Sequence, residues 1–345
     1  MEFERILVRA TNWVGDAVMS LPALHALRAR YPRAHISILA RSWVADLYGR
    51  EPFCDEVIDY DMPKGWKGLQ AKMDTARHLH RRGFDCALLL QNAFEAAAVA
   101  WLARIPVRIG YDRDGRGWLL THRVRVPAKD EIPRHQRFYY LELLKRAGII
   151  HEYPENVDAM LTGSEQASEQ GRVVFENHRL HSPVIGLSPG AAFGGAKRWL
   201  PERFADAAVQ IARERRADVA IFGSKEEAAL GDEVAAQVQS QGVRALNFAG
   251  KTTLREFIDL AAGCELFLTN DSGGMHIASA LGVPTAVVFG PTDEIATGPA
   301  GTRNAVIRHP VECSPCHLRE CPIDHRCMTR VSAEFVAESA LELLK

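Results

Sequence analysis

Short apolar runs alternate with turns and helical patterns along the whole chain. The apolar runs of the first half predict strands at 5–9, 35–40, 57–59, 86–90 and 105–111. After the first run, Val18, Leu21, Leu24 and Leu27 recur at three-residue steps and predict one helix over about 17–30. The second half predicts strands at 184–188, 218–223, 266–269 and 285–290, and helices at 201–215, 254–263 and 332–344. This alternation is typical of mostly parallel sheets covered by helices on both faces.

A polar stretch near 163–183 separates the two series and predicts a linker. We therefore expect an α/β protein of two doubly wound, Rossmann-like domains, at 1–165 and 183–328, followed by a helix at 332–345. Ligands of such sheets bind beyond the carboxyl ends of the strands, so the expected active site is a cleft between the two domains.

Composition and charge argue against several classes of protein. The 345 residues carry 42 Lys and Arg against 43 Asp and Glu, a formal charge of −1, which argues against a dedicated nucleic-acid binder. Hydrophobic residues make up 47% of the chain, which excludes intrinsic disorder. No apolar run approaches the roughly 18 to 20 residues that span a bilayer. The first residues lack a signal-peptide pattern, so we expect a cytoplasmic protein whose membrane contact, if any, is peripheral.

The first candidate for chemistry is the turn after the first strand, Asn12-Trp13-Val14-Gly15-Asp16. Gly15 permits a tight turn, and Asp16 then stands at the start of a helix. A helix N-cap is one interpretation of Asp16. A general base or a polar anchor in the cleft is the other.

A glycine-rich loop from Ser188 to Trp199 follows another strand and ends with two cations. Close backbone approach at Gly190 and the charge of Lys197 suit a phosphate group. The loop is not a Walker motif, because Ala-Lys-Arg follows its glycines in place of Lys-Ser or Lys-Thr. An ordinary surface loop with solvated cations is the alternative.

Residues 269–276 open a further helix. The first backbone N–H groups, at Ser272 and Gly273, would point at an anion, and the helix dipole adds to their field. Asp271 suits capping or accepting hydrogen bonds from sugar hydroxyls, and His276 could reach a phosphate or be structural. No Gly-x-Gly-x-x-Gly motif occurs, which argues against a nicotinamide or flavin site.

At the end of the strand at 218–223, Glu226 or Glu227 could accept hydrogen bonds from the hydroxyls of a ribose. A solvated helix start explains these carboxylates equally well.

Four cysteines lie close together, at Cys313, Cys316, Cys321 and Cys327. Thiols at such spacings could hold a structural Zn²⁺ ion. An iron–sulfur cluster, free thiols or a disulfide are the alternatives. A catalytic metal is not expected, because the cysteines lie far along the chain from the strand-end loops.

Together these motifs resemble glycosyltransferase family 9, the ADP-heptose:lipopolysaccharide heptosyltransferases. Within the family they are more similar to the enzymes that add the second heptose than to those that add the first. Ala192 departs from the acidic residue expected in many relatives. The resemblance rests on segments in the family's order over nearly the full chain: Asn12–Ser20, Leu90–Phe94, Ile105–Gly110, Pro189–Trp199, Thr269–His276 and 289–291.

The family implies a GT-B fold, with an N-terminal acceptor domain, a C-terminal nucleotide-sugar domain and a last helix that can pack back on the first domain. It implies inverting transfer of L-glycero-D-manno-heptose from ADP-heptose to the first heptose on Kdo-lipid A, at the inner face of a Gram-negative cytoplasmic membrane. Catalysis would need no metal cofactor, and no nucleic acid is expected as a partner.

The residues then take roles. Asp16 would be the base. Lys197 and the helix after Asp271 would stabilise the departing ADP. Other donor-site candidates are Ser188, Gly190, Glu226, Ser272, Gly273 and His276, and acceptor-site candidates are Asn12, Trp13, Asn92, Arg113 and Arg116.

Three other functions stay open at this point. One is another GT-B inner-core transferase, such as the enzyme for the first heptose. A second is a GT-B nucleotide-sugar epimerase, and a third is a non-catalytic nucleotide-binding or metal-stapled protein. Products formed from a panel of donors would separate them.

Overall fold

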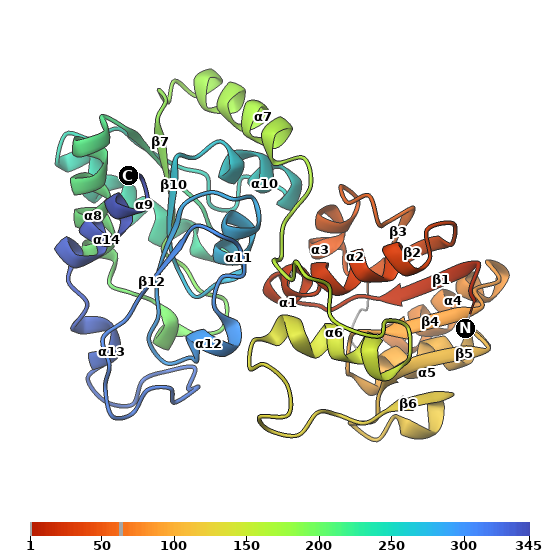
Figure 1. The fold of residues 1–345 in the computed structure, drawn as a ribbon. Coiled ribbons are helices and arrows are strands. Elements are labelled where there is room, and N and C mark those ends of the chain that lie inside the picture. Colours follow the sequence, from red (N-terminus) through yellow and green to blue (C-terminus); the bar gives the residue numbers. More distant parts are fainter. Residues whose placement is uncertain (1, 62–64) are drawn as a thin grey trace. The chain divides into compact units, whose positions relative to one another are not determined.

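The computed structural model describes residues 2–61 and 65–345, which divide after Thr162 into an N-terminal and a C-terminal unit (Figure 1). Each unit holds one six-stranded sheet in which all neighbouring strands run parallel. The α/β fold class expected from the sequence is confirmed.

The N-terminal sheet has the strand order β3-β2-β1-β4-β5-β6. Helices α1, α2 and α6 contact one another, whereas α4 packs against α5, so the sheet carries two separate helical layers. Its strands are β1 Arg5–Arg9, β2 His35–Ala40, β3 Glu56–Asp59, β4 Cys86–Leu89, β5 Val107–Tyr111 and β6 His122–Val124. Its helices are α1 Val14–Met19, α2 Leu21–Arg30, α3 Ser42–Tyr48, α4 Trp66–Arg81, α5 Phe94–Leu102, η1 Gly117–Leu119 and α6 Gln136–Arg146.

The C-terminal sheet has the order β12-β11-β10-β7-β8-β9. Helix α8 packs with α9 and α14, and α10 packs with α7 and α11. Its strands are β7 Val184–Ser188, β8 Asp218–Ile221, β9 Ala245–Asn247, β10 Leu266–Asn270, β11 Thr285–Val288 and β12 Asn304–Ile307. Its helices are α7 Ser164–Asn177, η2 Gly195–Lys197, α8 Pro201–Arg215, η3 Lys225–Glu227, α9 Ala228–Ser240, α10 Leu254–Ala262, α11 Gly273–Ala280, α12 Glu294–Thr297, α13 Arg326–Thr329 and α14 Ala333–Glu342.

The two sheets share one topology, because each runs outward in both directions from its first strand. The order therefore reverses between β1 and β4 in the N-terminal unit, and between β7 and β10 in the C-terminal unit. Connections leave these neighbouring strands toward opposite faces, which opens a crevice at their carboxyl ends where ligands of such sheets bind. The loops at 11–16 and 90–94 border the first of these switch points, and those at 188–199 and 270–276 border the second.

Two expectations about helices differ from the structure. The helix expected over 17–30 is two helices, α1 and α2, which meet at Ser20. Pro22 has no N–H to donate to the carbonyl of Val18, so the helical ladder is interrupted there. The polar stretch expected to be a linker instead forms α7, whose buried Ala167, Gly171 and Phe175 pack in the C-terminal unit.

The last helix, α14, packs against α8 and beside β11 and β12. Its apolar side, with Val336, Ala337 and Ala340, belongs to the buried core of the C-terminal unit. The expectation that the last helix can pack back on the first domain stays a prediction. The short strands β6, β9 and β12 were not predicted, since runs of three or four residues at or near a sheet edge carry little apolar pattern.

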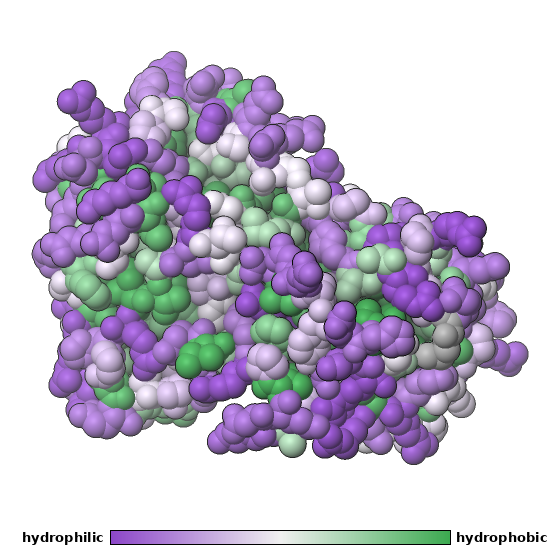
Figure 2. Space-filling view, in the orientation of Figure 1, coloured by the Kyte–Doolittle hydropathy of each residue, from purple (hydrophilic) through white to green (hydrophobic). Residues whose placement is uncertain are grey.

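On the face shown in Figure 2, hydrophilic side chains prevail in both units, and hydrophobic ones show in areas between them. Over the described part of the chain, none of the helices combines the length and the apolar character that a bilayer crossing requires.

Candidate functional site

Asp16 lies in the first turn of α1, directly after β1, at the switch point of the N-terminal sheet. The hydroxyl of Tyr140, from α6, donates a hydrogen bond to Asp16 Oδ1 at 2.9 Å. Burial raises the pKa of the Asp16 carboxyl, and this hydrogen bond partly opposes the rise. The N-cap of α1 is Trp13, so Asp16 is not the cap that the alternative interpretation required. A half-buried carboxylate with a raised pKa has the properties of a general base.

Asn12 and Trp13 belong to the same turn. Asn12 Oδ1 accepts a hydrogen bond from Arg9 at 3.0 Å, and its backbone carbonyl accepts one from Trp43 Nε1 at 2.8 Å. The turn is thereby held rigidly at the end of β1. The side chain of Trp13 is 63% exposed and presents an aromatic face beside this turn.

Asn92 and Arg113 lie at the same edge of the sheet, but Arg116 does not lie at the surface. Arg116 is fully buried, and its guanidinium donates to Tyr111 O at 3.0 Å, Asn92 Oδ1 at 3.1 Å and the carbonyl of Gln91. The contact with an acceptor that was expected of Arg116 is therefore wrong. Its N–H groups donate instead to two backbone carbonyls and to the side chain of Asn92. Arg113 is exposed and pairs with Asp114 at 3.5 Å.

Sequence reasoning missed a cluster of charged and aromatic side chains at this edge. Arg9 and Arg41 lie over the ring of Tyr60, with guanidinium carbons 4.9 and 5.0 Å from its centroid. Glu95 accepts the Tyr60 hydroxyl at 2.7 Å and lies 3.7 Å from Arg41 and 3.9 Å from Lys72. The sequence did hold a signal for this cluster, because each of three members ends or directly follows a predicted strand: Arg9, Arg41 and Tyr60.

In the C-terminal unit, the loop after β7 and the loop after β10 are joined by an ion pair. Lys197 Nζ lies 2.6 Å from Asp271 Oδ2, and the hydroxyl of Thr292 donates to the same oxygen at 2.6 Å. Both Asp271 and Thr292 are buried. The carboxylate of Asp271 therefore holds Lys197 in place. Thr292 was not predicted from the sequence.

The N-terminus of α11 completes this edge. Ser272 is the N-cap, but its hydroxyl lies 3.2 Å from Thr269 Oγ1 and does not cap the helix. The first N–H groups of the helix, beginning at Gly273, thus keep their capacity to bind an anion. Ser188 ends β7 beside them, since a Cβ atom added to Gly274 would lie 3.4 Å from its hydroxyl oxygen. His276, by contrast, is buried one turn inside the helix.

Glu226 and Glu227 follow β8 and have different environments. Glu227 Oε2 accepts the backbone N–H of Ser224 at 2.9 Å in a capping box. A Cβ atom at Gly190 would lie 2.1 Å from Glu227 Oε1, so a larger residue there would have to displace the Glu227 carboxylate. Glu226 is exposed. Glu227 is therefore committed to the local fold, and Glu226 is the exposed carboxylate of the two.

Two groups of hydrogen bonds shape the loop that carries Lys197. Asn270 donates to Pro189 O at 2.7 Å and accepts from the backbone N–H of Trp199 at 3.0 Å. On the other side, Arg319 O accepts from Ala196 N at 2.9 Å, and Glu320 accepts from the N–H of Gly195 at 3.0 Å. The segment with the cysteines, remote in sequence, thus lies against the loop.

The zinc site expected at Cys313, Cys316, Cys321 and Cys327 is not formed. All four are free thiols, and within residues 2–61 and 65–345 no three His, Cys, Asp or Glu side chains converge as metal ligands. Cys313 is exposed, whereas Cys327 is buried and its sulfur would lie 3.1 Å from a Cβ atom added to Gly290. The structure shows one role for the cysteine segment, which is its contact with the loop that carries Lys197.

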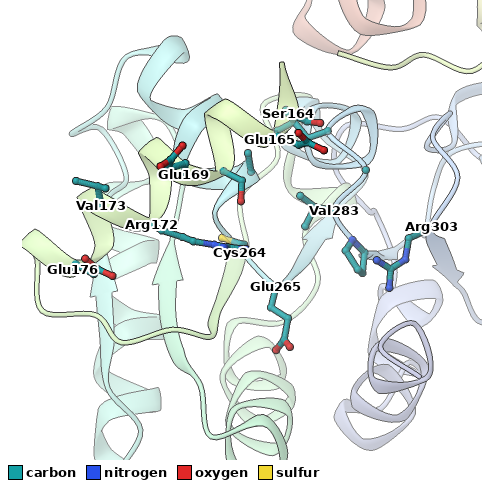
Figure 3. A pocket seen from close by; sticks show the side chains of 15 residues that line it. Ser164, Glu165, Glu169, Arg172, Val173, Glu176, Cys264, Glu265, Val283 and Arg303 are labelled. Carbon is teal, nitrogen blue, oxygen red and sulfur yellow. The ribbon is translucent and has the colours of Figure 1, made fainter. Parts of the chain in front are cut away.

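A hollow of about 720 Å³ also lies in the C-terminal unit, but at the opposite end of its sheet (Figure 3). Glu265 and Pro284, which line it, directly precede β10 and β11. Glu165, Glu169 and Glu176 of α7 add further negative charge (Figure 3). Four glutamates line the hollow together with Arg172 and Arg303, and none of the candidate residues lies there. The candidate site therefore remains at the carboxyl ends of the strands.

Residues 73–326 match the model of glycosyltransferase family 9 (heptosyltransferase). The chain is 34% identical over 308 residues to lipopolysaccharide heptosyltransferase 2 of Salmonella typhimurium, with 88% of each chain covered. It shares 30% identity and a TM-score of 0.82 with a solved structure of E. coli ADP-heptose LPS heptosyltransferase II, over 99% of this chain and 98% of that one. A family 9 structure from Veillonella parvula, 23% identical, has the same fold at a TM-score of 0.84, covering 99% and 97% of the chains. By these matches over most of its length, the chain belongs to glycosyltransferase family 9.

Proposed function

We propose that this glycosyltransferase moves L-glycero-D-manno-heptose from ADP-heptose to the first heptose of the lipopolysaccharide inner core, with inversion at the transferred carbon. The observation that carries the proposal is the pair of polar groups at the two switch points, Asp16 with Tyr140 and Lys197 with Asp271. The names of the heptosyltransferase 2 relatives support the sugar and the core oligosaccharide. A GT-B arrangement, in which both units serve one active site, is part of the proposal.

Asp16 acts as the base of the N-terminal unit. The acceptor hydroxyl oxygen forms a bond to the anomeric carbon of the heptose as the bond from that carbon to the ADP oxygen breaks. The hydroxyl proton passes to the Asp16 carboxylate, whose Oδ1 is oriented by Tyr140. Its raised pKa increases its strength as a base in this step.

The C-terminal unit holds the donor. As ADP departs it gains one negative charge, which the Lys197 ammonium and the first N–H groups of α11 stabilise. Asp271 fixes the position of the ammonium without occupying the anion site itself. Ser188, Gly190, Ser272 and Gly273 border the phosphates, and Glu226 accepts hydrogen bonds from the ribose. His276, inside α11, supports this helix.

The acceptor is Kdo-lipid A that bears one heptose, approached at the inner face of the cytoplasmic membrane. Asn12, Trp13 and Asn92 border the acceptor sugar, and Arg113 lies near enough to meet its anionic groups. Arg116 contributes through its hydrogen bond to Asn92.

The test is incubation of the pure protein with ADP-heptose and an acceptor that carries one heptose, followed by mass spectrometry. We expect one added heptose and released ADP. Transfer only to an acceptor without heptose would assign the first step of the core instead. An altered nucleotide-sugar without transfer would indicate an epimerase, and no reaction with any donor would contradict the proposal.

A further inference from the structure

Three large aromatic side chains lie exposed and in mutual contact on the N-terminal unit, and we call them the aromatic cluster: Phe94, Trp101 and Trp118. They are 45%, 47% and 61% exposed. The ring of Trp118 lies 6.2 Å from that of Phe94 and 6.2 Å from that of Trp101. Phe94 and Trp101 belong to α5, and Trp118 to η1.

The core does not require these side chains. Helix α5 already buries Ala96, Ala97, Val99 and Ala100 against the unit. The aromatic cluster lies on the other side of the helix, where water contacts the rings. Contiguous exposed apolar side chains of this size mark interaction surfaces.

Positive charge surrounds the aromatic cluster. Arg104 follows Trp101 by three residues, and Arg108 donates to the carbonyl of Leu119, next to Trp118, at 2.6 Å. Among the residues described, no carboxylate forms an ion pair with Arg104 or Arg108. Asp114 pairs with Arg113 at 3.5 Å, and Glu95 is occupied by Arg41 and Lys72. The Asp112 carboxylate lies against Gly117, next to Trp118. Arg104, Arg108, Arg113 and the buried Arg116 outnumber Asp112 and Asp114, so positive charge is in excess here. Of the two arginines without an ion pair, Arg104 is exposed and Arg108 is half-buried.

We propose that the aromatic cluster and these two arginines form the surface through which the enzyme binds an anionic phospholipid bilayer. Tryptophan rings favour the interface between headgroups and acyl chains, and arginines beside them attract anionic lipids. A second copy of the chain fits less well, because a twofold interface would place like cations against each other.

The argument for the location of this membrane-binding surface rests on the proposed function. An acceptor whose sugar is held near Asn92 while its acyl chains remain in the bilayer needs a membrane-binding surface close to that edge. Phe94 follows Asn92 by two residues, and the aromatic cluster continues from there along α5. The surface thus adjoins the acceptor side of the proposed site.

The experiment measures sedimentation of the full chain with phosphatidylglycerol vesicles, compared with phosphatidylcholine vesicles, with no substrate present. We expect binding to the anionic vesicles only. The double variant Trp101→Ser, Trp118→Ser should reduce the partition coefficient by about tenfold or more, because two interfacial rings are lost. Phe335→Ser, which removes an exposed aromatic ring of α14, is the matched control and should bind like the unaltered protein.

A second measurement separates this inference from the proposed function. The double variant should keep its transfer rate on a soluble, delipidated acceptor and lose rate on the acceptor embedded in vesicles. No transfer by the unaltered protein on either acceptor would contradict the proposed function and leave the vesicle result standing. Equal sedimentation of the double variant and the unaltered protein, or no vesicle binding at all, would overturn the inference. A dimer that the double variant dissociates, in the absence of vesicle binding, would assign the surface to self-association.

Discussion

At the scale of single residues, the proposed chemistry depends on two carboxylates in opposite environments. Asp16 is half-buried with a hydroxyl as its hydrogen-bond partner, so its charge is costly and its pKa rises. Asp271 is buried against the Lys197 ammonium at 2.6 Å, so its charge is compensated. The first arrangement suits a group that accepts a proton, and the second suits a group that fixes a cation.

Asp16→Asn should abolish most turnover while ADP-heptose binding persists. The amide keeps an acceptor for Tyr140 but cannot take the proton, so we expect kcat to fall by about 10²- to 10⁴-fold. The raised pKa of Asp16 means that its contribution to stability is complete at low pH and is lost as pH rises through that pKa. At neutral pH the variant should therefore melt no lower than the unaltered protein. Turnover close to normal would remove Asp16 as the base.

Tyr140→Phe should move the acid limb of the pH profile of kcat/KM to higher pH. The Tyr140 hydroxyl lowers the pKa of Asp16, so its removal leaves the effect of burial unopposed and the pKa rises further. Tyr111→Phe, which removes a hydroxyl bonded to a backbone carbonyl, is the control and should leave the limb in place. An unmoved limb in Tyr140→Phe would show that this hydroxyl does not act on the base.

Lys197→Ala should raise the donor KM and lower kcat together, because the ammonium interacts with ADP both before and during departure. Loss of one such charge-stabilising donor typically costs about 10²- to 10³-fold in kcat. Lys251→Ala removes an exposed lysine of the same unit and should change neither constant. A normal donor response in Lys197→Ala would place the phosphates elsewhere.

At the scale of elements, the pattern of apolar residues predicted the long helices and the central strands well. The strands β1, β2 and β7 and the helix α8 lie at the predicted residues, because their buried positions form continuous or regularly spaced apolar sets. Helix α7 was missed because its buried side is narrow. It packs on α10 through small residues, which carry little hydrophobic signal.

Gly171→Ala tests that helix contact. A Cβ atom at Gly171 would lie 2.0 Å from the carbonyl oxygen of Asp259 in α10 and 3.2 Å from the Cα of Gly263. Alanine favours the isolated helix, but this clash should dominate and destabilise the protein by about 1 to 3 kcal/mol. Urea unfolding measures the change. Gln170→Ala, at the exposed neighbouring position, should be neutral or slightly stabilising, and an equal effect of both would contradict the close packing.

At the scale of the whole molecule, the duplicated sheet topology places one switch point in each unit, with Asp16 and Tyr140 at one and the Lys197–Asp271 ion pair at the other. In the proposed function the first supplies the base and the second binds the ADP. The two units should therefore respond differently to ligands. A nucleotide that binds only the folded C-terminal unit adds stability to that unit by mass action.

Hydrogen exchange with saturating ADP should show this difference. We expect slower exchange at the loops 188–199, 223–227 and 270–276, because ligand binding reduces their local opening. The turn at 11–16 and the loop at 90–94 should exchange as before. Protection confined to the N-terminal unit would contradict the assignment of the donor to the C-terminal unit, and AMP in place of ADP should protect the Lys197 loop less.

The sequence by itself determined the α/β class, the duplication and the strand-end positions of Asp16, Lys197 and Asp271. These follow from local apolar periodicity and from the rule that parallel strands present their carboxyl ends together. Only the tertiary structure decided the partners of these groups, Tyr140 for Asp16 and Thr292 for Asp271, and the burial of Arg116. It also decided that, in the part of the chain it describes, the cysteine side chains do not converge as metal ligands. Such partners come from residues distant along the chain, and burial and hydrogen bonding set by the folded backbone have no counterpart in a local pattern.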